Sequence, residues 1–263
     1  ERRPAPTNQV QETCVMSTAA AEGDQELATR LAVEAGELLV RTRADLFAQG
    51  LNHWSVKDAG DDAAQSFLMN ELRALRPDDA VLSEEGREDP RRFSGGRVWI
   101  IDPLDGTREF AERDRVDWAV HIALWHDDHF VAGAVSLPAL GQVFAMDPAP
   151  VVPDISRPRP ILITTRNQAP PSAHWVARGL DCDALRLGSA GAKTMAVITG
   201  TADIYVHDGG MYQWDSAAPA AVAQAAGLHV SRIDGSPIIY NGRDAWLPDL
   251  IVCRPELADP VLR

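Results

Sequence analysis

Two amphipathic helices are expected in the first third of the chain. The first covers Asp24–Phe47. A loop with His53 and Trp54 follows, and the second helix begins at Asp61 or Asp62 and ends at Leu75. In both segments apolar residues recur every three or four positions, as on the buried face of a helix: Leu27, Leu31, Ala35, Leu38 and Leu39 in the first, and Phe67, Leu68, Leu72 and Leu75 in the second.

Short apolar runs predict strands in the next part of the chain. The expected strands are Ala80–Leu82, Val98–Ile101, Trp118–Trp125, Val131–Leu137 and Gly141–Ala145. The residues between the third and fourth runs form a short turn at positions 126–129. Consecutive strands with short connections indicate antiparallel pairing in this half.

A proline-rich segment divides the chain. Residues 148–160 contain five prolines, too many for a helix or a central strand. We therefore expect an α+β half over residues 23–150 that carries the site, and an α/β half over residues 151–263 that completes the cleft. In the second half strands and helices alternate: strands at 161–165, 184–187, 202–206 and 250–253, and helices at 171–179, 190–199 and 216–226.

The segment that follows the strand Val98–Ile101 carries the clearest chemistry. It reads Asp102-Pro103-Leu104-Asp105-Gly106-Thr107, and so places two carboxylates in one tight turn. Pro103 fixes one φ angle, Gly106 permits an unusual backbone conformation, and Thr107 can cap the next segment. Two close carboxylates repel each other, so a hard cation such as Mg²⁺ is expected beside them. Taken alone, an Asp-x-x-Asp pattern also fits a surface turn.

Other segments deliver carboxylates in the same way. The strand Ala80–Leu82 continues into Glu84 and Glu85, and Asp215 opens an alanine-rich helix. Asp61 is expected at a further helix start. Each has an ordinary alternative, because Glu84 by itself fits a solvated loop charge and Asp215 a helix N-cap. Since α/β folds place their sites at strand ends and helix starts, we expect these carboxylates to meet.

Charge and composition narrow the function. The 263-residue chain has 38 acidic and 25 basic residues, a net charge of −13. This excess argues against a non-specific nucleic-acid binder, which needs basic patches. A small anionic ligand is compatible with it if metal ions or local cations mediate binding. The sequence has no apolar run of membrane-spanning length.

The cysteines and the first residues bear on location. Cys14, Cys182 and Cys253 are widely scattered and odd in number, which indicates free thiols in a reducing compartment and favours a cytoplasmic protein. Residues 1–22 lack the apolar core of a secretory signal. They are expected to form a disordered tail or an expression remnant, with Met16 as a plausible start.

Three motifs together resemble the inositol monophosphatase-like, Mg²⁺-dependent and Li⁺-sensitive phosphatases. They are Glu84-Glu85, the run from Trp99 to Thr107, and the run from Trp214 to Pro219, in the family's order across about residues 25–255. The resemblance implies a layered αβαβα sandwich, the sugar phosphatase fold, of mixed α+β and α/β class. It also implies a phosphomonoesterase that forms a homodimer.

The resemblance implies roles for individual residues. One Mg²⁺ would be held by Glu84, Asp102 and the carbonyl of Leu104, and a second by Asp102, Asp105 and Asp215. Asp61 and Thr107 would orient and deprotonate the attacking water, beside a weaker third Mg²⁺. Backbone amides at Gly106 and Thr107, if they start a helix, would face the phosphate.

One departure affects the water-activating residue. Family members often carry Pro-Val-Thr-x-x-Asp there, whereas this chain reads Ser55-Val56-Lys57-Asp58-Ala59-Gly60-Asp61, followed by Asp62. Asp61 fits the spacing best. Asp58 and Asp62 stay open as alternatives.

The residues after the central motif indicate a subfamily. Gly106-Thr107-Arg108-Glu109-Phe110 resembles the Gly-Thr-Lys-Glu-Phe of the 3′(2′),5′-bisphosphate nucleotidases, the CysQ branch, rather than the Gly-Thr-Thr-Asn-Phe of inositol phosphatases. The run from Gly188 to Lys193 resembles that branch's Gly-Ser-x-x-x-Lys. Gly106, Thr107, Arg108, Gly188, Ser189, Lys193 and Asp215 are therefore the expected substrate contacts.

Arg108 and Lys193 suggest recognition of a second phosphate. Their ordinary alternatives are a surface cation paired with Glu109 or Glu112, for Arg108, and a solvated helix charge, for Lys193. The expected reaction is hydrolysis of the 3′-phosphate of adenosine 3′,5′-bisphosphate, or of its sulfated form. Inositol monophosphate, fructose 1,6-bisphosphate or another phosphorylated nucleoside or sugar is the alternative substrate. A non-catalytic partner-binding protein is the alternative class, and idle paired carboxylates argue against it.

Overall fold

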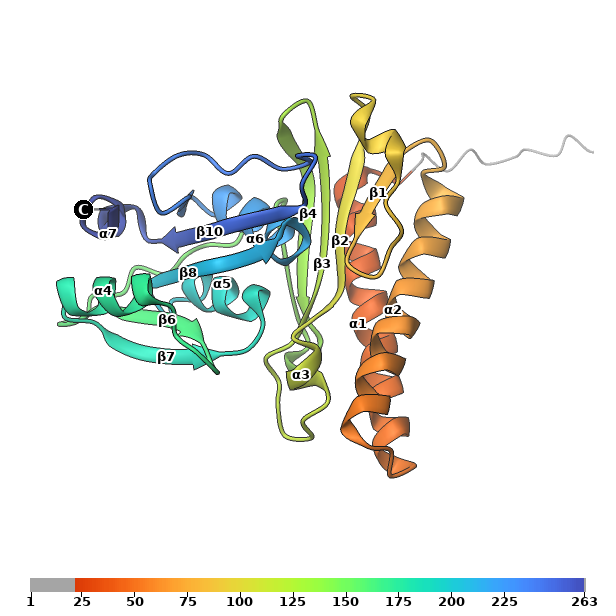
Figure 1. Ribbon diagram of the computed structural model, residues 1–263, viewed down its shortest axis with the longest axis horizontal. Coiled ribbons are helices and arrows are strands. Elements are labelled where there is room, and N and C mark those ends of the chain that lie inside the picture. The colour runs from red at the N-terminus through yellow and green to blue at the C-terminus, as the bar shows by residue number, and fades with distance from the viewer. Residues whose placement is uncertain (1–21, 263) are drawn as a thin grey trace, which may run out of the picture.

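Two long helices form one outer layer of the protein. The computed structural model describes residues 22–262, so the predictions for residues 1–21, Cys14 among them, lie outside the described part. Helix α1 (Asp24–Ala48) and helix α2 (His53–Leu75) lie side by side against one face of an upright sheet (Figure 1). The apolar faces of the two helices form one core with Trp99, Ile101 and Trp118.

The start of α2 differs from the prediction. The helix begins at His53, so His53 and Trp54 are not in a loop and Asp61 lies inside the helix rather than at its start. Asn52 is the N-cap, and its side chain accepts a hydrogen bond from the amide of Ser55 at 3.0 Å. The first two turns bury Val56 and Gly60. Because glycine is not counted as an apolar residue, the apolar pattern did not reveal these turns.

The first sheet has the order β1-β2-β3-β4-β5. Its strands are β1 (Ala80–Ser83), β2 (Val98–Asp105), β3 (Ala119–His126), β4 (His129–Leu137) and β5 (Gln142–Ala145). All neighbours pair antiparallel except β1 and β2, which are parallel. Asp127 and Asp128 both have positive φ, as a two-residue hairpin turn requires. The predicted antiparallel run is confirmed.

The second half forms another five-stranded sheet with the order β7-β6-β8-β10-β9. Its strands are β6 (Ile161–Thr165), β7 (Asp183–Leu187), β8 (Ile204–Tyr212), β9 (His229–Ser231) and β10 (Trp246–Cys253). Strand β8 runs six residues beyond the predicted end at Val206. Gly209 and Gly210 lie in this extension, both at positive φ. Because glycine is depleted in strands, strand propensity did not predict the extension.

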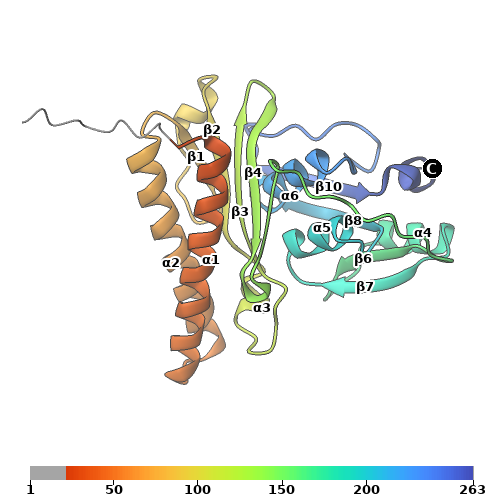
Figure 2. The same cartoon turned by 180° about the vertical axis from the view of Figure 1, so that it is seen from behind.

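Helices fill the space between the sheets and cover the far face. Helices α5 (Ala190–Ile198) and α6 (Gln213–Ala225) lie between the sheets, while α4 (Pro171–Gly179) and α7 (Ala258–Leu262) pack on the outer side of the second (Figures 1 and 2). The layers therefore alternate helix, sheet, helix, sheet, helix, which confirms the predicted αβαβα sandwich.

One apolar core joins the two halves. It contains Val98 and Val135 of the first sheet together with Ile163, Val222 and Val252 of the second half. Residues 146–160 contain no helix or strand, in agreement with the prolines. The proposed division at residue 150 stays a prediction, since the shared core packs both halves against each other. Within residues 22–262 no helix is long and apolar enough to cross a membrane.

Candidate active site

The end of β2 presents the two aspartates of the central motif. The amide of Leu104 donates to Asp102 Oδ1 at 3.0 Å, and the pairing of β2 with β3 is irregular between Asp102 and Asp105. Gly106 follows at φ 86° and leads into the short helix α3 (Thr107–Phe110). The glycine is needed there because residues with a side chain rarely adopt this conformation.

Each of three carboxylates has one oxygen fixed by the protein. Asp102 Oδ1 accepts from Leu104, Asp105 Oδ2 accepts from Ser189 Oγ at 2.5 Å and from the Gly191 amide at 2.8 Å, and Asp215 Oδ2 accepts from the Tyr212 amide at 2.7 Å. The other oxygen of each makes no hydrogen bond to any residue of the described range 22–262. The orientation of the carboxylates is thus set while an oxygen of each stays available.

The carboxylates gather into one cluster from four elements. Glu84 follows β1, Asp102 and Asp105 end β2, Asp215 lies in the first turn of α6, and Asp61 lies on α2. The charges of Asp215, Asp105 and Asp61 all act on Glu84. The structure therefore brings together the acidic residues that the sequence predicted, although Asp215 is the third residue of its helix rather than the N-cap.

Burial and mutual repulsion raise the pKa values of most carboxylates in the cluster. Loss of surrounding water, followed by the neighbouring carboxylates, raises the pKa of Glu84 to about 8 and that of Asp61 to about 7, although the Glu84 side chain reaches solvent. Burial and the charge of Asp105 raise the pKa of Asp215 to about 6. Burial and the same neighbour raise the pKa of Asp102 well above its usual range.

Asp105 behaves differently because of the groups around it. Burial by itself would raise its pKa, but His121, Lys193 and the Ser189 hydrogen bond outweigh burial and lower it. Asp105 is therefore the carboxylate of the cluster that is charged most readily. The negative charge of Asp105 then makes ionisation of the neighbouring carboxylates less favourable.

His121 is a site residue that the sequence reasoning missed. It pairs with Asp102 across β2 and β3, it is fully buried, and its Nε2 lies 3.2 Å from Asp105 Oδ2. Its Nδ1 lies 3.2 Å from the carbonyl oxygen of Trp214, so it links both aspartates to the start of α6. A histidine in the middle of the apolar strand Trp118–Trp125 was the available signal.

The cluster fits a hard cation. Asp102 Oδ2 is buried without a hydrogen-bond partner, a costly state for a carboxylate oxygen that a bound cation would relieve. All of the clustered donors are oxygens, which Mg²⁺ and similar ions prefer. Within residues 22–262 no three His, Cys, Asp or Glu side chains are already arranged to hold one ion, so binding would require the free oxygens to close around it.

Asp61 is better placed than its alternatives. Asp58 and Asp62 are exposed, whereas Asp61 is half-buried and lies within the field of Glu85 and Glu84. The neighbouring Gly60 lets α2 approach the motif closely, because a Cβ there would lie 2.5 Å from the ring of Phe110. Thr107, the other predicted catalytic residue, donates its hydroxyl to the Leu104 carbonyl at 3.3 Å.

The predicted substrate contacts at α5 lie beneath the cluster. Ser189 caps α5 by accepting from the Ala192 amide at 2.9 Å while it also holds Asp105. Lys193 is only 3% exposed, and its ammonium donates to the carbonyl of Gly188 at 2.5 Å. The alternative of a solvated helix charge is therefore wrong for Lys193. Direct contact of Lys193 with a substrate stays a prediction.

Arg108 has the opposite environment. Its side chain is exposed on α3 and makes no hydrogen bond or ion pair with residues 22–262. The expected alternative, a pair with Glu109 or Glu112, is wrong, because Arg166 takes both of those carboxylates. Arg108 is thus a free cation beside Thr107.

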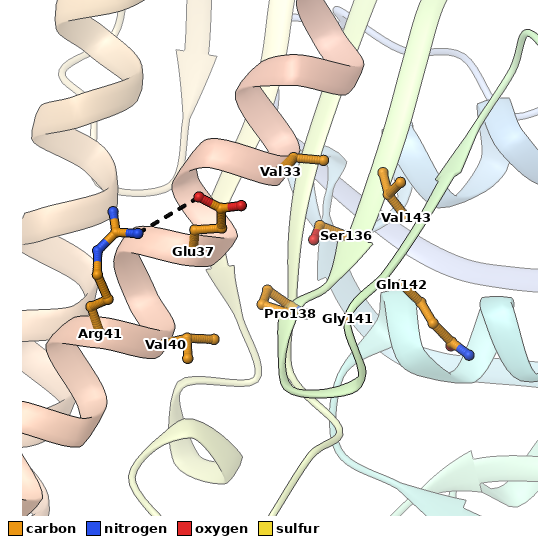
Figure 3. A pocket seen from close by; sticks show the side chains of 9 residues that line it. All are labelled: Val33, Glu37, Val40, Arg41, Ser136, Pro138, Gly141, Gln142 and Val143. Carbon is orange, nitrogen blue, oxygen red and sulfur yellow. Dashed lines mark ion pairs between the residues drawn. The ribbon is translucent and has the colours of Figure 1, made fainter.

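A separate apolar pocket is lined by none of these residues. It is lined by Val33 and Val40 of α1 and by Pro138 and Val143 near β5, and has a volume of about 350 Å³ (Figure 3). It contains none of the clustered carboxylates, and the charged pair in it, Arg41 and Glu37, is exposed. The pocket therefore plays no part in the chemistry considered above.

Known proteins resemble this chain over most of its length. Residues 22–260 match the sequence model of the inositol monophosphatase family. The chain is 46% identical over 256 residues to a 3′-phosphoadenosine 5′-phosphate phosphatase of Mycobacterium leprae, covering 91% of this chain and 92% of that protein. It is 34% identical over 205 residues to the 3′(2′),5′-bisphosphate nucleotidase CysQ of Escherichia coli, covering 72% and 81%.

A solved structure supports the fold. The inositol monophosphatase II of Staphylococcus aureus superposes with a TM-score of 0.75 and 21% identity, over 89% of this chain and 90% of that one. At this level of identity the likeness concerns the architecture alone. It agrees with the five layers described above.

Proposed function

Because this chain belongs to the inositol monophosphatase family, we propose that it is a metal-dependent phosphomonoesterase that converts adenosine 3′,5′-bisphosphate into AMP and phosphate. The observation that carries the proposal is the convergence of Asp61, Glu84, Asp102, Asp105 and Asp215 at the end of β2. The names of the Mycobacterium leprae and Escherichia coli relatives support the choice of substrate. The sulfated nucleotide is a second substrate of the same kind.

The family is generally metal-dependent, and we propose Mg²⁺ as the ion, two or three per site. Glu84, Asp102 and the Leu104 carbonyl would hold one, and Asp102, Asp105 and Asp215 another. Bound there, the ions would lower the pKa of water and neutralise phosphate and leaving-group oxygens. Li⁺ inhibition follows from the weaker third position that the resemblance implies. Cytoplasmic location and a homodimer stay predictions.

The protein's own residues supply the proton transfers. Asp61, with a pKa of about 7, is suited to accept a proton from the attacking water near neutral pH. Thr107 would orient that water from the start of α3. The water oxygen would bond to phosphorus as the bond from phosphorus to the 3′-oxygen breaks. That oxygen would take a proton from a water beside Asp215, and the hydroxide left there would be neutralised by the proton that Asp61 accepted, which returns through solvent.

A phosphate-release assay tests the proposal. The full chain is given Mg²⁺ and, in turn, adenosine 3′,5′-bisphosphate, inositol 1-phosphate and fructose 1,6-bisphosphate. We expect the nucleotide to have the highest kcat/KM, and Asp102→Asn to lose nearly all turnover because Asp102 is the proposed bridge between ions. A preference for inositol phosphate would reject the nucleotidase proposal, and full activity of Asp102→Asn at saturating Mg²⁺ would reject the metal site.

A further inference from the structure

The start of helix α5 holds one of the clustered carboxylates. Two donors, the hydroxyl of Ser189 at 2.5 Å and the backbone N–H of Gly191 at 2.8 Å, are directed at the same oxygen, Asp105 Oδ2. A carboxylate at the first turn of a helix is also stabilised by the helix dipole. Asp105 Oδ1 makes no hydrogen bond to residues 22–262, so the position of α5 decides where this free oxygen points.

The turn before α5 is itself held by Asp117, which lies two residues before β3 and is only 4% exposed. Asp117 Oδ2 accepts a hydrogen bond from the backbone N–H of Gly188 at 2.6 Å. The carbonyl oxygen of Asp117 accepts another from the backbone N–H of Ser189 at 3.3 Å. The side chain of Arg115 donates to Asp117 Oδ2 as well. Asp117 thus binds both residues of the turn and is kept in place by an arginine.

We propose that Asp117 is a positioning residue for the cation site: by holding the turn at Gly188 and Ser189, it keeps Asp105 oriented to bind Mg²⁺. The inference rests on the proposed function, and it adds a residue that touches neither the ion nor the substrate. The role requires an acceptor oxygen at position 117 rather than a negative charge, because the turn presents a backbone N–H group.

The segments that meet at this turn leave it little room to move. A Cβ at Gly106 would lie 3.1 Å from the Cβ of Ser189 and 3.2 Å from the carbonyl oxygen of Asp117. A Cβ at Gly191 would lie 2.2 Å from Nε2 of His121. The central motif, the segment before β3 and the start of α5 are therefore in close contact. Interiors packed in this way transmit strain, so loss of the Asp117 side chain should displace the donors at the start of α5.

The alternative is that Asp117 and Arg115 form a buried ion pair that affects stability alone. The two roles differ in one measurable respect. A residue that only stabilises the fold changes the thermal midpoint and leaves the Mg²⁺ dissociation constant as it was. A residue that positions a metal ligand also weakens metal binding, typically by about 10- to 100-fold.

The test follows Mg²⁺ binding through the thermal midpoint of the full chain. The midpoint is measured as the Mg²⁺ concentration is raised from zero, which gives a dissociation constant without turnover. The Mg²⁺ concentration that half-saturates phosphate release is measured alongside. We expect Asp117→Ala to raise both values by about ten- to a hundredfold. Asp117→Asn keeps an acceptor oxygen for the Gly188 N–H, and should bind Mg²⁺ nearly as the wild type does.

Arg115→Gln is a milder variant of the same contact, since the Arg115 side chain is partly exposed. It leaves Asp117 in place but frees it to move, so we expect a smaller loss of Mg²⁺ affinity in the same direction. Circular dichroism shows whether each variant is folded. If Asp117→Ala does not fold, Arg115→Gln decides the question, and an unchanged Mg²⁺ dissociation constant in it would overturn the inference.

Asp249 provides the matched control. Its carboxylate also combines one arginine partner, Arg232 at 2.7 Å, with one backbone N–H, that of Ile233 at 2.8 Å. Within the described part of the chain, neither partner makes a hydrogen bond or ion pair to the carboxylate cluster. Asp249→Ala should therefore lower the thermal midpoint and leave the Mg²⁺ dissociation constant unchanged.

The outcomes separate this inference from the proposed function. An unchanged Mg²⁺ dissociation constant in folded Asp117→Ala, or an equal change in Asp249→Ala, would overturn the inference and leave the proposed function intact. A loss in Asp117→Asn as large as that in Asp117→Ala would also overturn it, because the charge rather than the acceptor would then matter. A wild-type protein whose midpoint does not respond to Mg²⁺ would overturn the proposed metal site and this inference with it.

Discussion

The guanidinium of Arg92 donates to the carbonyl oxygen of Gly242 at 2.8 Å, although 150 residues separate them in the chain. Arg92 is 1% exposed and also donates to the Arg243 carbonyl and the Asn241 side chain. The backbone N–H of Asn241 in turn donates to the side-chain oxygen of Gln213, the first residue of α6. This chain of contacts joins the segment after Glu84 to the helix that carries Asp215.

The first prediction concerns the stability of this connection. Arg92→Met keeps the apolar stem of this buried side chain and leaves the two part-buried carbonyls of Gly242 and Arg243 without their donor, so we expect the free energy of unfolding to fall by about 1–3 kcal/mol. Arg87→Met, at an exposed position nearby, is the control and should change it by less than about 0.5 kcal/mol. Urea denaturation measures both. A similar small change in both variants would show that Arg92 does not connect the halves energetically.

The second prediction concerns pH and metal removal. The pKa values of Glu84, Asp61, Asp215 and Asp102 are raised in the folded protein. In chelator the folded state binds more protons than the unfolded chain between the ordinary carboxyl pKa and about 8, so stability should fall as the pH rises across that window.

Mg²⁺ should reverse this trend, because it binds the ionised carboxylates. The thermal midpoint is measured with chelator and with Mg²⁺ at about pH 5 and about pH 8, and the gain from Mg²⁺ should be larger at the higher pH. Asp102→Asn removes one member of the cluster and should flatten the dependence seen in chelator. An Mg²⁺ gain that is equal at both pH values would contradict the cation site.

Local patterns were enough to predict most of the fold and to point out the acidic residues that the structure brings together. Helix α4 begins at Pro171 and ends at Gly179, as the sequence predicted. The strand before Asp102 was predicted from its apolar run. Both follow from short-range features: proline at a helix start, and a β-branched segment that ends in a turn.

Features that depend on long-range packing could not be predicted. The burial of Lys193 arises where α5 packs against β3 and β8. The role of His121 depends on the register that sets it opposite Asp102. The start of α2 was missed because Gly60 is buried against Phe110, a contact that lies far away in sequence. Tertiary contacts override local preference at such positions.

The third prediction distinguishes the candidates for water activation. Asp61→Asn should lower kcat by about 10²- to 10⁴-fold, the usual contribution of a general base. Asp62→Asn makes the same chemical change one residue later at an exposed position, and should retain turnover. Steady-state kinetics at saturating Mg²⁺ compare the two. A larger loss in Asp62→Asn would move the role to that residue.

The fourth prediction concerns the turn before α5. A Cβ at Gly188 would lie 2.0 Å from the Glu109 carboxyl carbon, and that side chain is buried against Arg166. Gly188→Ala should therefore lower the free energy of unfolding by about 1–3 kcal/mol and disturb Ser189, which holds Asp105. Gly96→Ala is the control, since a Cβ there meets no atom within 4 Å. Equal denaturation midpoints for the two variants would show that the turn can move aside.

The last prediction concerns Lys193, which the sequence indicated as a substrate contact. Its ammonium is buried, binds the Gly188 carbonyl, and lies in the field of Asp105 and Asp215. Lys193→Met keeps the length of the side chain but leaves that carbonyl and those carboxylates without their partner. We therefore expect kcat/KM to fall by about ten- to a hundredfold on adenosine 3′,5′-bisphosphate and on adenosine 3′-monophosphate alike.

Arg108→Gln is the contrasting variant, because its loss should be concentrated on the bisphosphate. The same two substrates, at fixed Mg²⁺ and ionic strength, serve for both variants. Equal losses on the two substrates in Lys193→Met would mean that Lys193 acts through the turn that positions Ser189 and Asp105. A loss confined to the bisphosphate would instead show that the ammonium reaches the second phosphate, which requires the Gly188 contact to break when substrate binds.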